Sequence, residues 1–144
     1  MGDMFKILLF LFCICNVVAD NEVFERIKNG TVVIKRMMGS ESRHFFKNVG
    51  SGFIVDPKNG YVMTCAHVLA GWQERDKDNR TLAVGLFDGR TVKAKPVLMY
   101  YNRDVAIVQI IPNQYVKLPL PDDYSVPFRH SSDLGMGEDV FVLG

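Results

Sequence analysis

The chain has 144 residues, of which 48% are hydrophobic and 23% charged, and its formal net charge is +1. These values are ordinary for a globular protein, so they exclude an intrinsically disordered chain and predict one domain. Positive and negative charges are interspersed, and the basic surface that nucleic acid or an anionic membrane would require is missing. We therefore expect neither of these as a partner.

Residues 1–19 have the pattern of a secretory signal peptide. An apolar run from Ile7 to Val18 ends in small residues at Ala19. This run is shorter than the roughly 20 apolar residues of a membrane-spanning helix, so we expect cleavage after Ala19 and no membrane association afterwards. The predicted location is the secretory pathway or the cell exterior, with an organellar lumen as the alternative. A buried helix or an uncleaved anchor stays open, because Asp3 weakens the positive charge expected before the apolar run.

The cysteines and two glycosylation motifs bear on this route. Cys13 and Cys15 lie in the predicted signal peptide, so the mature chain would hold Cys65 alone and no internal disulfide. We interpret Cys65 as a small buried apolar residue, with a reactive thiol as the alternative. Asn29 and Asn79 each begin an Asn-x-Thr tripeptide and are glycosylation candidates.

After the predicted signal peptide, short apolar runs of β type alternate with turn residues, without a long stretch of helical period. Asp88-Gly89 separates two alternating runs and is typical of a hairpin turn. Six antiparallel strands close readily into a small barrel, which removes exposed sheet edges. The sequence thus predicts an all-β fold, a six-stranded antiparallel barrel within residues 20–118. The six runs cover residues 31–35, 52–55, 61–65, 81–87, 91–101 and 105–110, and a seventh run covers 140–143.

Two polar stretches interrupt this pattern. Residues 72–80 are dense in both charge signs, and Asp76 and Asp78 raise the possibility of calcium binding. Arg80, however, stands where an EF-hand loop would carry its third oxygen ligand, so we expect a solvated loop and no metal. Residues 112–132 contain four prolines and little periodicity, which predicts an extended linker.

A histidine and an aspartate stand at strand boundaries. His67 follows the run 61–65, and Asp104, 37 residues later, opens the run 105–110. A serine hydroxyl is a poor nucleophile at neutral pH, so serine hydrolases use a histidine to take its proton and a buried carboxylate to orient the imidazole. A core histidine and a turn-capping aspartate are the alternatives.

Three segments together carry a family resemblance. GSGFIVDPKNGYVMTCAHVLAG at 50–71 is similar to the segment around the catalytic histidine of Do-like (HtrA) serine proteases, which have the trypsin fold. NRDVAIVQI at 102–110 resembles their aspartate strand, and SSDLGMGEDVFVLG at 131–144 resembles the segment where their second barrel begins. The resemblance implies that His67 is the base and Asp104 the orienting acid. It also implies that residues 119–144 form the inter-barrel linker and the start of a truncated second barrel.

The nucleophile has no candidate. In the family it lies in a Gly-Asn-Ser-Gly-Gly-like loop of the second barrel, whose N–H groups also form the oxyanion hole, and no such loop occurs in these 144 residues. Ser51 precedes the histidine and is expected to serve close backbone packing between two glycines. Ser125, Ser131 and Ser132 fall in the predicted linker. Arg103 replaces the small hydroxyl residue usual in the family, and a cation there could compete with His67 for the carboxylate.

These observations favour a truncated Do-like serine endopeptidase that is inactive alone and, by resemblance, acts on proteins or peptides without a cofactor. The alternative is a non-catalytic, protein-binding pseudoprotease that associates with full-length relatives through the apolar run 140–143. A half-enzyme without a stable fold is the third possibility. The cleavage preference depends on a specificity pocket that the resemblance places in the second barrel.

Overall fold

The computed structural model describes residues 21–40, 43–70, 82–126, 128, 131–133 and 135–136. The expected signal peptide, the polar loop 72–80 with Asn79, and the expected strand 140–143 lie outside these residues. Among the described residues, no helix is both long and apolar enough to cross a membrane.

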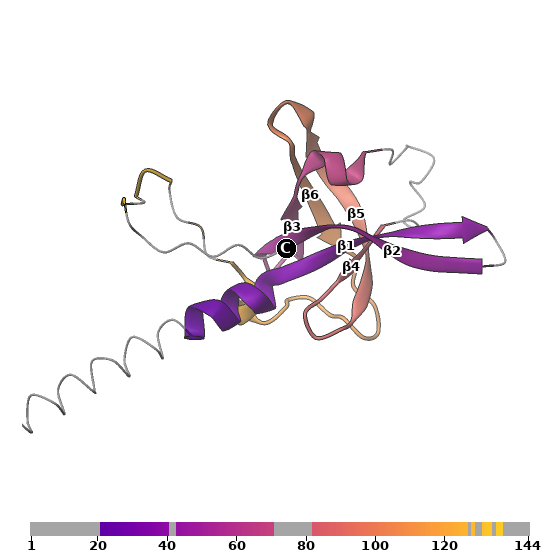
Figure 1. The fold of residues 1–144 in the computed structure, drawn as a ribbon. Helices are drawn as coiled ribbons and strands as arrows, with labels where there is room; N and C mark the ends of the chain where they lie inside the picture. The colour runs from indigo at the N-terminus through magenta and orange to yellow at the C-terminus, as the bar shows by residue number, and fades with distance from the viewer. Residues whose placement is uncertain are drawn as a thin grey trace, which may run out of the picture.

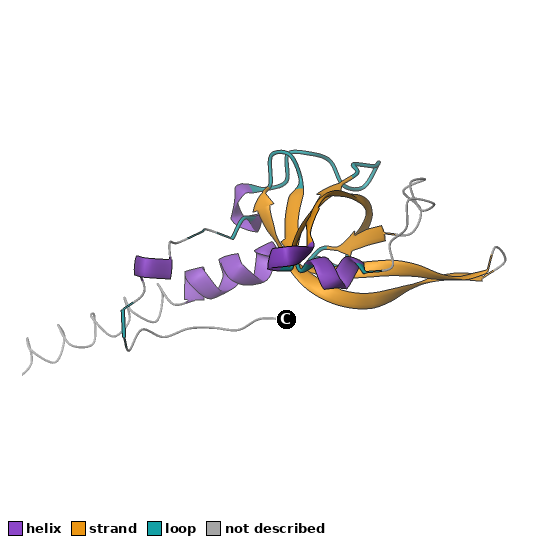
Figure 2. Cartoon of the chain, turned by 90° about the horizontal axis from the view of Figure 1, so that it is seen from above, coloured by secondary structure: helices purple, strands orange, loops and turns teal. Residues whose placement is uncertain are grey.

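Six antiparallel strands form a closed barrel with the neighbour order β1-β2-β3-β6-β5-β4 (Figures 1 and 2). This arrangement confirms the predicted fold. Each strand overlaps one of the six apolar runs expected from the sequence. The strands are β1 (Thr31–Ser40), β2 (Arg43–Asp56), β3 (Tyr61–Thr64), β4 (Leu82–Gly85), β5 (Thr91–Tyr100) and β6 (Val105–Ile110).

The core fills the barrel interior with aliphatic side chains. Along β3 and β6 every second residue is buried, as expected for strands with one face toward the core. Register shifts at Ile34/Lys35 in β1 and Pro96/Leu98 in β5 bend these strands, which helps six short strands to close on themselves. The largest fully buried side chains are Ile34, Ile54, Leu69, Ile110, Val32, Val62, Val84, Val92, Val108 and Val116.

The predicted Asp88-Gly89 hairpin connects β4 and β5. Gly89 has a φ of +88°, a backbone conformation that side chains with a Cβ rarely adopt. The Gly89 N–H donates to the Leu86 carbonyl at 3.0 Å, and the Leu86 N–H donates to the Arg90 carbonyl at 2.8 Å. The turn chemistry therefore fixes the register between the two strands.

Strands β1 and β2 run further than the sequence predicted. Only residues 33–36 of β1 pair with β4, whereas β1 pairs with β2 as far as Ser40. The outer parts of the two strands form a two-stranded ribbon that projects from the barrel (Figure 2). Met38, Phe45 and Phe46 on this ribbon are exposed, so this part of the sheet has no core of its own.

Residues 21–30 are helical, which the sequence analysis did not predict. The Lys28 Nζ lies 3.1 Å from Glu25 Oε2 within the helix and 4.6 Å from the centre of the Phe87 ring on the barrel. The Thr31 hydroxyl donates to the Ile27 carbonyl at 2.7 Å, where the helix gives way to β1. Tertiary contacts of this kind stabilise short helices whose own period is weak.

The stretch expected to be an extended linker packs against the barrel as far as residue 126. Val116 and Leu120 are buried in the core. The Leu120 N–H donates to the Pro57 carbonyl and the Val126 N–H to the Ile54 carbonyl, at 2.8 and 3.0 Å. Val116, Leu118 and Leu120 recur at every second position, and Leu118 also packs against the core. The prolines around them led us to predict a linker instead.

Candidate active site

The barrel topology brings His67 and Asp104 to the same end of two neighbouring strands. Strands β3 and β6 are antiparallel, and Thr64, the last residue of β3, pairs with Ala106 near the start of β6. His67 lies in the 3-10 turn η1 (Ala66–Leu69) that follows β3. Asp104 immediately precedes β6. Residues 37 apart in the chain therefore meet because the sheet pairs the strands that carry them.

Asp104 makes two hydrogen bonds to His67. The His67 backbone N–H donates to Oδ1 at 2.8 Å, and the ring Nδ1 lies 2.6 Å from Oδ2. The first bond fixes the carboxylate relative to the chain that carries the ring, and the second fixes the ring itself. The two predicted site residues are thus in direct contact.

The local backbone aims Asp104 at this position. It follows the 3-10 turn η3 (Tyr101–Arg103) and has a left-handed conformation with φ 52° and ψ 42°. Aspartate tolerates this conformation better than most residues do, because its short polar side chain can bond locally. The Asp104 N–H donates to the Tyr101 carbonyl at 3.1 Å, so the turn that positions the carboxylate is itself closed.

The hydrogen bonds also determine the protonation of the pair. The backbone N–H of His67, followed by its ring, holds the pKa of Asp104 below its usual value. An ionised carboxylate can only accept hydrogen bonds, so Nδ1 of His67 must carry the proton between the two groups. In the neutral ring this leaves Nε2 as the free acceptor.

The pair is more open than the sequence analysis expected. The side chains of His67 and Asp104 are 71% and 48% exposed, whereas the chemistry of a catalytic carboxylate led us to expect burial. Both groups sit in turns at the barrel end, and the described residues do not enclose them.

Cys65 was expected to be buried, and this was wrong: its side chain is exposed. In β3, Val62 and Thr64 face the core while Tyr61 and Met63 do not. Continuing this alternation by one residue would have placed Cys65 on the outer face. One ligand atom from each of Cys65, His67 and Asp104 lies within 4.8 Å of the others, and among the described residues this is the one group suited to hold a metal ion.

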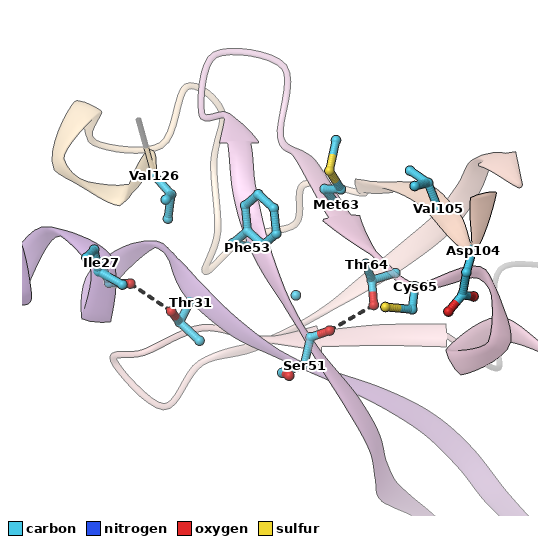
Figure 3. A pocket seen from close by; sticks show the side chains of 11 residues that line it. Ile27, Thr31, Ser51, Phe53, Met63, Thr64, Cys65, Asp104, Val105 and Val126 are labelled. Carbon is cyan, nitrogen blue, oxygen red and sulfur yellow. Dashed lines mark hydrogen bonds between the residues drawn. The ribbon is translucent and has the colours of Figure 1, made fainter. Parts of the chain in front are cut away.

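An open pocket of about 420 Å³ is lined in part by Asp104 (Figure 3). Asp104 and Cys65 line one side of it, and Phe53, Met63 and Val126 contribute apolar surface. The buried Thr64 hydroxyl donates to the Ser51 carbonyl at 2.8 Å, which ties β2 to β3 at the pocket wall.

No serine in the described residues is hydrogen-bonded to His67, whose ring contacts Asp104. Ser51 is flanked by glycines that allow close packing, as expected: a Cβ on Gly52 would lie 2.7 Å from the Met63 carbonyl oxygen. The Ser125 hydroxyl donates to the Asp122 carbonyl at 3.0 Å. Ser132 Oγ lies 3.4 Å from Asp133 Oδ1.

Two further sequence expectations concern neighbouring groups. Arg103 is exposed, and among the described residues it forms no ion pair with Asp104. Asn29 is half-buried, and its Nδ2 donates to Asp123 Oδ2 at 3.3 Å. Its glycosylation stays a prediction.

The chain is similar to a known protein family and to several known proteins. Residues 50–144 match the trypsin-like peptidase domain family. A probable periplasmic serine protease, do/HhoA-like, from Haemophilus influenzae is 41% identical over 105 residues, covering 72% of this chain and 19% of the relative. A probable periplasmic serine endoprotease, DegP-like, from Halomonas elongata is 35% identical over 98 residues, covering 68% of this chain and 17% of the relative.

The periplasmic serine endoprotease DegP of Escherichia coli K12 is 33% identical over 111 residues, covering 71% of this chain and 21% of the relative. The chain therefore spans about a fifth of the length of the curated relatives it matches. The closed six-stranded barrel is consistent with these matches. The chain belongs to the trypsin-like peptidase domain family, and its relatives are Do-like serine proteases.

Proposed function

We propose that this chain supplies the base and the orienting acid of a Do-like serine endopeptidase that cleaves proteins or peptides, with the serine supplied by a second barrel. The observation that carries this proposal is the double hydrogen bond from Asp104 to the backbone and ring of His67. One carboxylate thereby orients the imidazole in two ways, as an acyl-transfer site requires.

The chemistry follows from the tautomer. With Nδ1–H bound to Asp104, Nε2 of His67 can take the proton of a serine hydroxyl while the oxygen attacks a peptide carbonyl. The imidazolium that forms is stabilised by the ionised carboxylate, and it returns the proton to the leaving amine. No step in this sequence needs a metal or an organic cofactor.

The exposure of His67 and Asp104 supports the presence of a second barrel beside them. Electrostatic catalysis works best where water is excluded, yet His67 is 71% exposed. The adjacent pocket presents Phe53, Met63 and Val126, an apolar surface suited to contact another folded unit. A second barrel on this face would cover the pair and bring the nucleophile to it.

By this proposal the 144-residue chain is inactive alone. It contains no Gly-x-Ser-Gly-Gly-type loop, so both the attacking oxygen and the oxyanion donors of that loop are missing. Their joint loss removes most of the rate acceleration that remains when one triad member is deleted. The names of the relatives place them in the periplasm, which supports export of this chain as well.

The test uses two proteins. The 144-residue chain is compared with a fusion that continues into the second barrel of the Escherichia coli relative. We expect no fluorophosphonate adduct and no casein hydrolysis with the chain alone. The fusion should show both, and His67→Ala in the fusion should abolish hydrolysis.

Three outcomes would contradict the proposal. A His67-dependent adduct on the chain alone would mean that its nucleophile lies within these residues. If the fusion still hydrolyses casein after His67→Ala, His67 is not the base. A fusion that melts cooperatively but neither labels nor hydrolyses would show that this His–Asp pair does not serve a serine.

A further inference from the structure

Cys65 adds a third metal-binding group to the His–Asp pair. Its Sγ, a ring nitrogen of His67 and a carboxylate oxygen of Asp104 all lie within 4.8 Å of one another. The three side chains come from one end of the barrel: Cys65 directly follows β3, His67 lies in η1, and Asp104 precedes β6. None of the peptidase chemistry described above uses the thiol.

This set of donors is one that zinc prefers. Thiolate, imidazole and carboxylate are the three side-chain ligands of Zn²⁺ in proteins, and open zinc sites commonly have three protein ligands and one exchangeable water. A site of three carboxylates would suit calcium or magnesium, but the sulfur and nitrogen donors favour a softer ion. We propose that Cys65, His67 and Asp104 bind Zn²⁺.

The geometry requires only small side-chain rotations. Zinc bonds of 2.0–2.3 Å in a tetrahedral arrangement place ligand atoms roughly 3.3–3.8 Å apart. The thiol must approach by about 1 Å from the 4.8 Å limit. The ring nitrogen facing Asp104 must separate from Oδ2, now at 2.6 Å, or the ring must turn its other nitrogen to the ion. All three side chains are exposed, so these rotations leave the barrel core unchanged.

One contact prepares the carboxylate for this role. Asp104 Oδ1 accepts the His67 backbone N–H at 2.8 Å, which leaves Oδ2 to turn between the ring and an ion without releasing the side chain. Hydrogen bonds of this kind commonly orient carboxylate ligands in metal sites.

Zinc binding would hold the site in an inactive state. A ring nitrogen coordinated to the ion cannot take a proton, and a carboxylate drawn to the ion no longer orients the ring. The binding itself does not depend on the peptidase proposal, whereas this inhibitory consequence rests on it. Zinc binding is therefore tested on this chain alone, without a second barrel or a substrate.

The experiment measures the reaction of the Cys65 thiol with Ellman's reagent. The full chain carries Cys13→Ser and Cys15→Ser, so that one thiol remains. Saturating ZnCl₂ should slow the reaction at least tenfold, and EDTA should restore the original rate. The ratio of rates without and with zinc should fall close to one in His67→Gln and in Asp104→Ala. Asp88→Asn, at the other end of the barrel, should keep the tenfold protection.

Two results would overturn the proposal. An unchanged thiol reaction rate in ZnCl₂ would show that the three groups do not bind the ion. Equal protection in the parent, in His67→Gln and in Asp104→Ala would mean that the thiol binds zinc without these partners. Each variant is compared after its cooperative thermal melt has been confirmed. No step of this experiment measures peptidase activity. A negative zinc result would therefore leave the proposed function intact, and an inactive fusion protein would leave the zinc proposal intact.

Discussion

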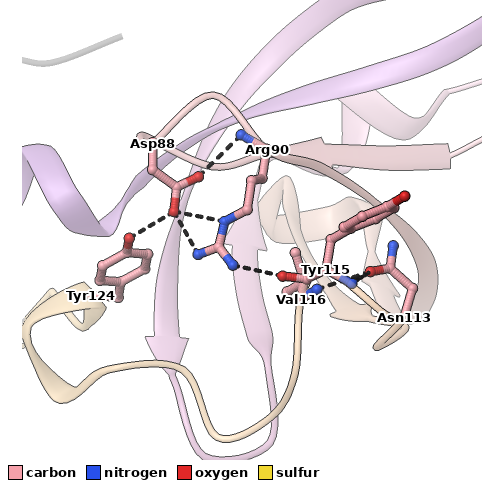
Figure 4. Close-up of polar contacts among 6 residues, drawn as sticks. All are labelled: Asp88, Arg90, Asn113, Tyr115, Val116 and Tyr124. Atoms are coloured by element: carbon pink, nitrogen blue, oxygen red, sulfur yellow. Dashed lines mark hydrogen bonds and ion pairs between the residues drawn. The ribbon is translucent and has the colours of Figure 1, made fainter.

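Two aspartates stand at opposite ends of β5, and their surroundings differ in kind. Asp88 precedes the strand in the β4–β5 turn, where Oδ2 accepts from Arg90 Nε at 2.9 Å and from the Tyr124 hydroxyl at 2.9 Å (Figure 4). Asp104 follows the strand and is bound by the backbone and ring of His67. One carboxylate has a partner that is always charged, whereas the other has a partner that can gain or lose a proton.

The pair of Asp88 and Arg90 is suited to stabilise the fold, whereas the pair of Asp104 and His67 is suited to proton transfer. Arg90 holds the pKa of Asp88 at about 2, and its Nη1 also donates to the Tyr115 carbonyl at 2.8 Å, which ties the turn to the segment after β6. The Asp88 cluster therefore stabilises the packing of that segment. At the other end the side chains of His67 and Asp104 are 71% and 48% exposed, as the proposed approach of a substrate and a second barrel requires.

The largest effect that separates the two ends is on catalysis. In the fusion with a second barrel, Asp104→Asn should lower kcat by about 10⁴-fold, because an amide no longer selects the Nδ1–H tautomer of His67. Asp88→Asn is the matched control and should keep kcat near that of the parent. Steady-state kinetics on a peptide substrate makes the measurement. Equal losses in both variants would mean that Asp104 acts only through stability.

A smaller effect concerns two glycines, one within β2 at the pocket that Asp104 lines and one in the β4–β5 turn. A Cβ on Gly52 would lie 2.7 Å from the Met63 carbonyl oxygen, whereas a Cβ on Gly89 would meet nothing within 4 Å. Gly52→Ala should therefore lower the free energy of unfolding by about 3 kcal/mol, since backbone must move. Gly89→Ala should cost about 1 kcal/mol, for its positive φ alone. Urea denaturation measures both, and a Gly89 variant less stable than the Gly52 variant would contradict this order.

A third effect is a pH dependence specific to Asp88. Its folded-state pKa is lowered, so it stabilises the fold above the unfolded-state pKa of about 3.9 and loses this contribution as the pH falls toward 2. The side chain is 30% exposed, and solvent screening reduces the contribution to about 1–2 kcal/mol. The free energies of unfolding of the parent and Asp88→Asn should differ by this amount at pH 6 and converge between pH 4 and 2. A gap that stays constant down to pH 2 would show that Asp88 does not act through its charge.

The sequence predicted those parts of the molecule that depend on local alternation and turn chemistry. Strands such as β3 and β6 have period-two patterns, and Asp88-Gly89 specifies its own turn. That His67 and Asp104 share one site was implied by the resemblance of their segments to Do-like proteases. The meeting of these two residues needed only the pairing of β3 with β6.

Other parts depend on contacts between residues distant in the chain, which a local sequence pattern does not specify. The helix at 21–30 is stabilised partly by Lys28 over Phe87, and Val116 enters the core from a proline-rich stretch. The exposure of Cys65 is a different case, since the alternation along β3 already predicts that the next residue lies on the outer face. We assigned that residue by its chemical type instead of its position in the pattern.

The central claim is that this barrel orients His67 through Asp104 without help from a second barrel. Long-range ¹H–¹⁵N NMR of the chain alone, with His67 assigned by His67→Gln and the ring neutral, reports which nitrogen carries the proton. We expect the Nδ1–H tautomer to predominate and Asp104→Asn to shift the ring toward Nε2–H. An Nε2–H tautomer in the parent chain, unchanged by Asp104→Asn, would contradict the account.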